Sequence, residues 1–159
     1  MSSQTIAHEG RARPRPDVVV NDFSIQVATV NGSGSQSSNA VLMRSIFRMG
    51  VPVSGKNLFP SNIAGLPTWF TIRASKQGYI ARKKENDLLI AMNPATARED
   101  VADLEPGAAV VYEEKLRLDR VRSDVTFYPV PFGELAQKIV PEAKLRKLLA
   151  NMIYVGVVG

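Results

Sequence analysis

A glycine-rich loop between a predicted strand and a predicted helix constrains this chain more than any other feature. Residues 23–30 (FSIQVATV) are few and rich in β-branched side chains, which is typical of a buried strand. Residues 39–50 (NAVLMRSIFRMG) place Leu42, Ile46 and Met49 at helical spacing. The helix start offers three polar side chains as caps: Ser37, Ser38 or Asn39. Strand, glycine loop and helix in this order predict an α/β unit of the nucleotide-binding type.

The loop itself is the first candidate site. Its members are Gly32, Ser33, Gly34, Ser35, Gln36 and Ser37. Glycine at positions 32 and 34 permits backbone angles closed to other residues and lets a phosphate approach the main chain. The helix that follows offers free N–H groups and a partial positive charge. The alternative interpretation, a tight turn without a ligand, remains open at this stage.

Two familiar nucleotide sites fit the loop poorly. An NAD site needs an acidic residue about 20 positions further on, and that region instead contains Lys56 followed by Asn57. A Walker-type ATP site needs a lysine at the end of the loop, and the sequence has none there. NAD and ATP are therefore disfavoured, whereas a phosphorylated ribose remains compatible with Lys56.

The rest of the chain continues the α/β pattern. Residues 68–75 alternate apolar and polar side chains, and a turn at 76–78 leads into residues 78–82, which predicts an inserted β-hairpin. Residues 88–92 form a continuous apolar run typical of a strand in a parallel sheet. Asn93, before Pro94, is both a helix cap and a candidate ligand-binding residue. Further strands are expected at 108–112 and 125–130, with helices at 97–104, 132–139 and after Pro141. We predict a Rossmann-like, three-layer α/β domain with a mostly parallel sheet.

Charge is unevenly distributed along the chain. The formal net charge is +5, and no acidic residue occurs between Asp22 and Glu85. The basic residues of this interval are Arg44, Arg48, Lys56, Arg73, Lys76, Arg82, Lys83 and Lys84. These charges can be ordinary solvated surface charge. Because the glycine loop lies in the same interval, we expect them instead to surround a polyanionic ligand or an acidic partner surface.

Composition excludes several classes of function. Without cysteine, the chain cannot build a disulfide framework, ligate an iron-sulfur cluster or use a thiolate nucleophile. One histidine, His8, disfavours a histidine-rich metal site or a Ser/His/Asp triad. No run approaches a membrane span or a secretory signal, so we expect a cytoplasmic protein without membrane partners. Residues 1–20 are predicted to be a flexible, Pro- and Arg-rich arm, and residues 21–159 one domain.

Five segments, in order and without large gaps, closely resemble the gamma domain that opens the alpha subunit of 2-oxoacid:ferredoxin oxidoreductases, above all the 2-oxoglutarate type. They are residues 27–75, 87–96 (DLLIAMNPAT), 106–114 (PGAAVVYEE), 127–132 (FYPVPF) and 145–156 (LRKLLANMIYVG). Many gamma domains have Gly-x-Gly-Gly-Gln-Gly in the loop, so Ser35 and Ser37 stand where glycines are usual. Lys56, Asn57 and Asn93 match the family in position.

The resemblance implies a part of a thiamine-diphosphate enzyme that oxidatively decarboxylates a 2-oxoacid to acyl-coenzyme A and reduces ferredoxin. It places thiamine diphosphate, Mg²⁺ and the iron-sulfur cluster on partner domains or subunits. For this chain it implies assembly with the rest of the alpha subunit and with the beta subunit, and coenzyme A as a candidate ligand of the glycine loop. No catalytic or metal-binding residue is assigned to this chain.

The last residues, MIYVGVVG, form an apolar run without a capping signal, which predicts a domain cut from something longer. Because the family's catalytic alpha domain does not follow, we expect the isolated chain to be inactive. The alternative hypothesis is a free-standing, non-catalytic module that binds coenzyme A or a nucleotide. Nucleic-acid binding, suggested by charge only, is the least favoured hypothesis because no recognised module or set of stacking aromatic residues supports it.

Overall fold

One mixed sheet organises the molecule. The computed structural model describes residues 21–60 and 63–159, so the predicted arm at 1–20 and His8 lie outside the described residues. Its strands are β1 (Asp22–Val30), β2 (Val53–Leu58), β3 (Pro67–Ser75), β4 (Leu88–Ala91), β5 (Ala109–Glu113) and β6 (Thr126–Val130). They follow the spatial order β2-β3-β1-β4-β5-β6. Strands β1, β4, β5 and β6 are parallel to one another, whereas β3 is antiparallel to both β1 and β2.

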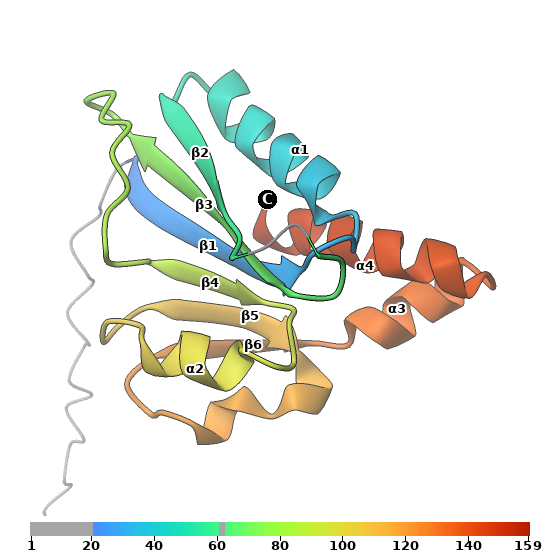
Figure 1. Ribbon diagram of the computed structural model, residues 1–159. Coiled ribbons are helices and arrows are strands. Elements are labelled where there is room, and N and C mark those ends of the chain that lie inside the picture. The colour runs from blue at the N-terminus through green and yellow to red at the C-terminus, as the bar shows by residue number, and fades with distance from the viewer. Residues whose placement is uncertain (1–20, 61–62) are drawn as a thin grey trace, which may run out of the picture.

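Helices cover both faces of this sheet (Figure 1). They are α1 (Ser35–Arg48), α2 (Ala97–Ala102), α3 (Phe132–Ile139) and α4 (Ala143–Val158). Helices α1, α3 and α4 pack on one face, and α2 packs on the other together with two 3-10 turns (Glu114–Leu116 and Leu118–Arg120). The predicted three-layer, Rossmann-like fold is therefore confirmed.

The inserted hairpin is present, but its predicted partner strand was wrong. Strand β3 pairs with β2, which precedes it, rather than with residues 78–82, which form no strand. The reason is that β2 and β1 occupy both edges of β3, so no edge remains for a following strand. Strand β2 has no alternating apolar pattern to reveal it. Its Gly55 leaves room for the side chains of Phe70 and Met43, which would crowd any Cβ at that position.

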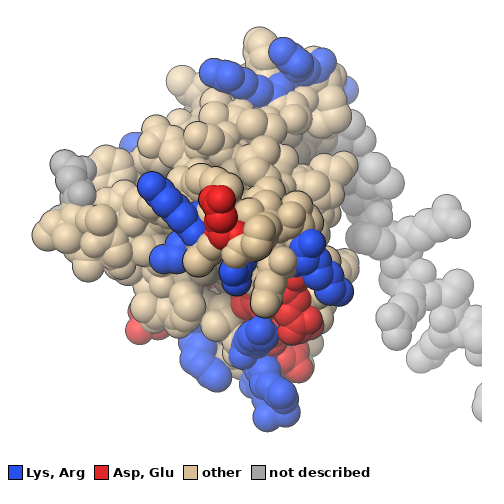
Figure 2. All heavy atoms as spheres, turned by 90° about the vertical axis from the view of Figure 1, so that its right-hand side faces the viewer, with Lys and Arg blue, Asp and Glu red and all other residues tan. Residues whose placement is uncertain are grey.

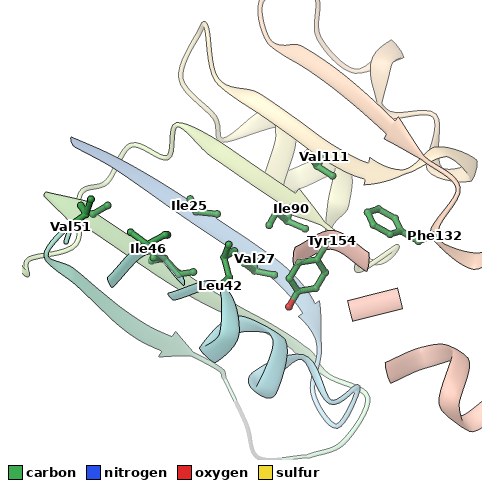
Figure 3. Close-up of a cluster of buried hydrophobic side chains, with 11 residues drawn as sticks. Ile25, Val27, Leu42, Ile46, Val51, Ile90, Val111, Phe132 and Tyr154 are labelled. Carbon is green, nitrogen blue, oxygen red and sulfur yellow. The ribbon is translucent and has the colours of Figure 1, made fainter. Parts of the chain in front are cut away.

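Two apolar cores lie on opposite faces of the sheet. The core under α1, α3 and α4 contains Ile25 and Val27 of β1, Leu42 of α1 and Tyr154 of α4 (Figure 3). The core under α2 contains Ala28, the next residue along β1, with Leu89 and Val101. Because successive residues of a strand face opposite sides, the continuous apolar runs of β1 and β4 serve both cores at once.

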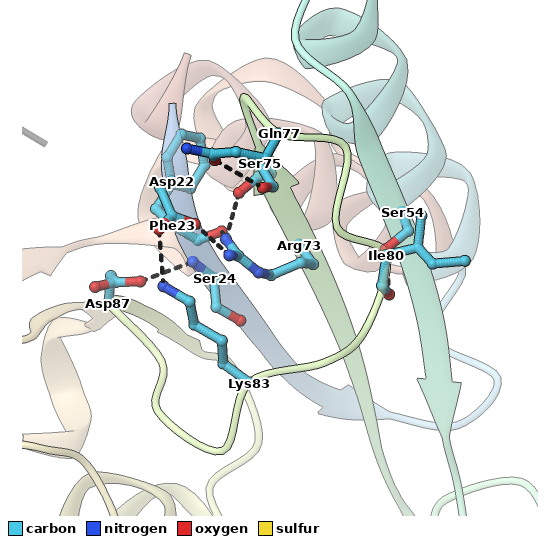
Figure 4. Close-up of polar contacts among 11 residues, drawn as sticks. Asp22, Phe23, Ser24, Ser54, Arg73, Ser75, Gln77, Ile80, Lys83 and Asp87 are labelled. Carbon is cyan, nitrogen blue, oxygen red and sulfur yellow. Dashed lines mark hydrogen bonds and ion pairs between the residues drawn. The ribbon is translucent and has the colours of Figure 1, made fainter. Parts of the chain in front are cut away.

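A charged network closes the start of β1 (Figure 4). Arg73 of β3 is buried, and its guanidinium donates hydrogen bonds to the Asp22 carboxylate and to the Phe23 carbonyl oxygen. Lys83 Nζ lies 3.4 Å from the other carboxylate oxygen of Asp22. The Arg73 hydrogen bond holds the pKa of Asp22 below its ordinary value of 3.8.

Candidate functional site

The glycine loop leaves the carboxyl end of β1, where open α/β sheets usually bind ligands. Gly32 and Gly34 have φ angles of 81° and 83°, in the left-handed region that favours glycine. The loop is tied to the hairpin because Asn31 N–H donates to the Leu66 carbonyl oxygen at 2.8 Å and Gly65 N–H donates to the Asn31 carbonyl oxygen at 2.9 Å. The two glycines are thus held in the backbone conformation for which the sequence singled them out.

Helix α1 begins at Ser35, earlier than predicted, so the expected capping by Ser37, Ser38 or Asn39 was wrong. Gly34 takes the cap position, and no side chain of the described residues caps this helix. The first turn contains no acidic side chain. Its N–H groups therefore keep their capacity to donate to a ligand, and the helix adds a partial positive charge.

Buried polar side chains surround this helix start. Thr29 Oγ1 lies 2.9 Å from Ser35 Oγ in a buried hydrogen bond. The Tyr154 hydroxyl of α4 donates to Asn39 Oδ1 at 2.7 Å and lies 3.4 Å from the Ser35 carbonyl oxygen. Burial raises the pKa of Tyr154 above its ordinary value of 10.0, so the hydroxyl keeps its proton and remains a donor.

Helix α4 packs directly against the loop. Asn151 Nδ2 donates to the Ser33 carbonyl oxygen at 2.8 Å, and Ser38 Oγ lies 3.2 Å from Met152 Sδ. A Cβ on Gly34 would overlap the end of the Leu148 side chain, so glycine at this position allows the close contact with α4 as well as the positive φ angle. The loop is consequently braced by α4 on one side and by the hairpin on the other.

A cavity of about 430 Å³, here named the loop cavity, lies between the glycine loop and the β2–β3 hairpin. Its lining residues are Thr29, Asn31, Gly32, Gly34, Ser35, Gln36, Asn39, Asn57, Phe59, Thr68 and Phe70. None of these described residues carries a charge. The cavity therefore combines backbone donors, amide side chains and two aromatic rings.

A second cavity of about 370 Å³, here named the α4 cavity, lies across the loop and is lined by Thr29, Asn31 and Gly32 as well. Ser33, Asn151 and Lys147 contribute from the loop and from α4. Lys147 is the one charged group among the described residues that line either cavity. A ligand that passes over the loop can thus contact neutral groups on one side and a cation on the other.

The structure brings most of the predicted loop residues to these cavities, but not all of the predicted site. Gly32, Gly34, Ser35, Gln36 and Asn57 line the loop cavity, and Ser33 lines the α4 cavity. Ser37 is exposed and lines neither.

Lys56 and Asn93 lie away from the cavities. Lys56 precedes Asn57 on β2 and faces the opposite side of the sheet, because successive side chains of a strand alternate. Asn93 is buried beside the end of β1, where Nδ2 lies 3.4 Å from the Thr29 carbonyl oxygen and Oδ1 accepts a hydrogen bond from Ala95 N–H at 3.0 Å. These contacts give Asn93 a structural role at the turn before α2.

Thr29, Asn39, Lys147 and Tyr154 are among the residues of this site that sequence reasoning missed. Alternation along β1 could have identified Thr29, because it shares the face of Ile25 and Val27. Nothing local in the sequence indicates Asn39, which was interpreted as a cap, or Tyr154 and Lys147, which come from a helix more than a hundred residues away.

The expectation that the charges of the basic interval surround a ligand at the glycine loop was wrong, whereas an acidic partner surface for them stays a prediction. None of its eight basic side chains lines either cavity. Arg73 is buried in the network with Asp22, and Arg82, Lys83 and Lys84 line a separate cavity of about 590 Å³ that also contains Asp100 and Asp103. These basic residues are near the glycine loop in sequence but not in space, because β3 runs antiparallel to β1 and returns the chain to the opposite end of the sheet.

Two further observations concern metals and membranes. Among residues 21–60 and 63–159, no group of three or more His, Asp or Glu side chains is placed to hold a metal ion. Within the same ranges, no helix combines the length and the apolar character needed to cross a membrane.

Comparison with known proteins agrees with the fold. The chain is 24% identical over 100 residues to the alpha subunit of 2-oxoacid:ferredoxin oxidoreductase 2 of Aeropyrum pernix, a match that covers 63% of this chain and 16% of that protein. The chain is also similar to the 2-oxoglutarate:ferredoxin oxidoreductase of Magnetococcus marinus, whose structure holds 2-oxoglutarate, coenzyme A and succinyl-CoA (TM-score 0.71, 24% identity, 82% of this chain and 23% of that chain). It thus spans well under a third of either relative.

Separate subunits of related enzymes share the fold over most of their length. The gamma subunit of a keto/oxoacid ferredoxin oxidoreductase from Geobacter sulfurreducens matches with a TM-score of 0.67 and 14% identity, over 86% of this chain and 75% of that one. A subunit of the Thermotoga maritima pyruvate oxidoreductase matches with a TM-score of 0.61 and 13% identity, over 82% and 74%. The model of the pyruvate ferredoxin/flavodoxin oxidoreductase family matches residues 24–159. The chain therefore belongs to the pyruvate ferredoxin/flavodoxin oxidoreductase family.

Proposed function

We propose that residues 21–159 are the gamma domain of a 2-oxoacid:ferredoxin oxidoreductase alpha subunit, most similar to the 2-oxoglutarate type. The observation that carries this proposal is the family match over residues 24–159. The complete enzyme would convert a 2-oxoacid and coenzyme A into acyl-coenzyme A and CO₂, and would pass the released electrons to ferredoxin. Within it, this domain would serve assembly and coenzyme A binding rather than the chemical steps.

The glycine loop fits coenzyme A for three physical reasons. The first turn of α1 presents N–H groups beside Gly32 and Gly34, which suits a phosphate. Lys147 provides a cation on the other side of the loop. The amide side chains of the loop cavity can bind the uncharged parts of the same ligand. A coenzyme A molecule lying across the loop would use all three.

The remaining cofactors fit partner chains better than this one. Iron-sulfur clusters are usually held by cysteine thiolates, and this chain has no cysteine. The family resemblance assigns thiamine diphosphate and Mg²⁺ to the partner domains or subunits as well. Without these partner chains, this chain would have no catalytic turnover.

Helices α1 and α4 provide a suitable surface for the rest of the enzyme. Phe47 and Met49 at the end of α1 are 66% and 71% exposed, and Leu145, Leu148 and Met152 of α4 are each more than 40% exposed. Seen from the side of α3 and α4, basic groups at the upper edge and mixed charges in the lower half flank a broad uncharged area (Figure 2). Partner subunits would cover this area in a cytoplasmic complex.

Reconstitution tests the proposal. The chain, joined to or mixed with the catalytic alpha and beta parts, is assayed for reduction of a low-potential viologen dye with 2-oxoglutarate, pyruvate and a branched 2-oxoacid, each with and without coenzyme A. We expect dye reduction that requires both coenzyme A and a 2-oxoacid. An intact complex with its thiamine diphosphate and clusters that reduces no dye with any 2-oxoacid would contradict the proposal.

A further inference from the structure

We propose that Asn39 is a ligand-binding residue of the loop cavity and that Tyr154 positions it. Asn39 is only 2% exposed and lines this cavity from the second turn of α1. The inference rests on the proposed function for the identity of the ligand, coenzyme A, and adds the atom that recognises it. The ligand group is an acceptor-rich one, a phosphoryl group.

The orientation of the Asn39 amide follows from its partner. The Tyr154 hydroxyl donates to Oδ1 at 2.7 Å, which directs the other half of the amide, Nδ2, away from α4. Among the described residues, Nδ2 has no hydrogen-bond acceptor, although most of the side chain is buried. The residue lines the loop cavity, and Nδ2 is not one of the fully buried polar atoms without a partner, so a ligand in the cavity can reach this free donor.

The neighbours of Nδ2 point to the chemistry of that ligand. The cavity also receives the start of α1, whose N–H groups are donors and whose dipole favours negative charge. No described residue that lines the cavity is acidic, so nothing there repels an anion. The donor amide of Asn39 and the helix start therefore favour the same ligand group.

Tyr154 acts through Asn39. Its pKa is raised by burial, so the hydroxyl does not ionise near neutral pH and the amide orientation is constant. Tyr154 belongs to α4, which also contacts the loop through Asn151 and Leu148. Helix α4 is consequently part of the binding site, and its displacement would release the Asn39 amide.

The test measures binding of three probes to the 159-residue chain by calorimetry: coenzyme A, dephospho-coenzyme A and pantetheine, which lacks all phosphates. Asn39→Ala should lose roughly ten- to hundredfold in affinity for a phosphate-bearing probe, as expected for one hydrogen bond to a charged group. Asn39→Asp should lose more, because it replaces a donor by a carboxylate. The two phosphorylated probes distinguish the phosphate at the ribose from the diphosphate. Ser45→Ala, on the exposed side of the same helix, is the matched control and should bind as the parent chain does.

A second measurement does not depend on how the variants fold. In nitrogen-15 spectra of the parent chain, the side-chain amide of Asn39 should shift on addition of coenzyme A. That of Asn86, which donates to Gln26 on the opposite face of the sheet, should stay in place.

Tyr154→Phe should weaken binding of coenzyme A but not of pantetheine, a selective loss that a merely structural role of the hydroxyl would not produce.

The outcomes separate the two proposals. If coenzyme A binds but neither the Asn39 variants nor the Asn39 resonance responds, the role of Asn39 is wrong and the proposed function stands. If pantetheine binds as tightly as coenzyme A, the phosphoryl assignment is wrong. If the reconstituted enzyme is active but coenzyme A shifts no residue of the loop cavity, this inference fails while the oxidoreductase assignment holds.

Discussion

The two ends of β1 use polar groups in opposite ways. At its start, Asp22 is paired with the buried Arg73 and with Lys83, so the charges of this end are matched within the protein. At its carboxyl end, the α1 start and the Asn39 amide offer donors that the described residues leave without acceptors. The basic residues that stand out in the sequence therefore include Arg73 and Lys83, which form ion pairs at the start of β1. The carboxyl end, which suits a ligand, has only Lys147 as a charged side chain among the described cavity residues.

The largest expected effect belongs to the loop end. Gly34→Val combines a β-branched side chain at a φ of 83° with overlap against Leu148, and should lower the free energy of unfolding by roughly 3 kcal/mol. Gly50→Val is the matched control, because Gly50 has a φ of 81° but no neighbour within 4 Å of the added atom. Urea denaturation measures both. Equal losses for the two variants would show that the Leu148 contact places no constraint on position 34.

A smaller, pH-dependent effect is expected at the start of β1. The Arg73 hydrogen bond lowers the pKa of Asp22, so its contribution to stability is complete above the ordinary value of 3.8 and disappears as the pH falls through the lowered pKa. Asp22→Asn should therefore destabilise the protein at neutral pH and flatten the loss of stability in acid. Melting temperatures of the two proteins, followed from neutral pH to below 3.8, test this. Parallel curves would mean that the Asp22 pair contributes nothing.

Lys147 should have a modest effect at the loop end. Its side chain is exposed in the α4 cavity, where water screens the charge, so Lys147→Ala should weaken coenzyme A binding by about threefold. Raising the salt concentration should reduce this difference. Lys144→Ala, also exposed on α4 but not lining the cavity, serves as the control. A loss as large as that of Asn39→Ala would place the main anion contact on the α4 side of the loop.

The basic segment at residues 82–84 should have the smallest effect. Arg82 and Lys84 line the cavity on the α2 side of the sheet, so replacing both by alanine should leave coenzyme A affinity within about twofold. Calorimetry on the double variant tests this directly. A strong loss would restore the interpretation that the basic interval binds the ligand.

Local patterns in the sequence predicted most of the fold. The apolar runs predicted β1 and β4, and the helical spacing of apolar residues predicted α1. Asn93-Pro94 predicted the boundary between β4 and α2, and the structure contains all four elements. Strand β2 could not be predicted because Gly55, Lys56 and Asn57 lack an apolar alternation, and only pairing with β3 makes them a strand. This pairing also brings Asn57 to the loop cavity and turns Lys56 away from it.

The candidate site was half predictable for a related reason. Gly32 and Gly34 could be predicted as loop residues from the sequence, since few other residues adopt their positive φ angles. Asn39 and Tyr154 depend on a contact between two helices that lie 115 positions apart in sequence. No local pattern encodes such a contact, so the amide that completes the cavity became visible only in the folded chain.

Hydrogen exchange of the assembled enzyme, compared with and without coenzyme A, tests the central claim most directly. The account predicts slower exchange of backbone amides in residues 31–39 and in the part of α4 around Tyr154, with no change at residues 76–87. Slower exchange confined to residues 76–87, or no change anywhere in this domain despite coenzyme A-dependent activity, would contradict the claim that the loop end of β1 is the binding site.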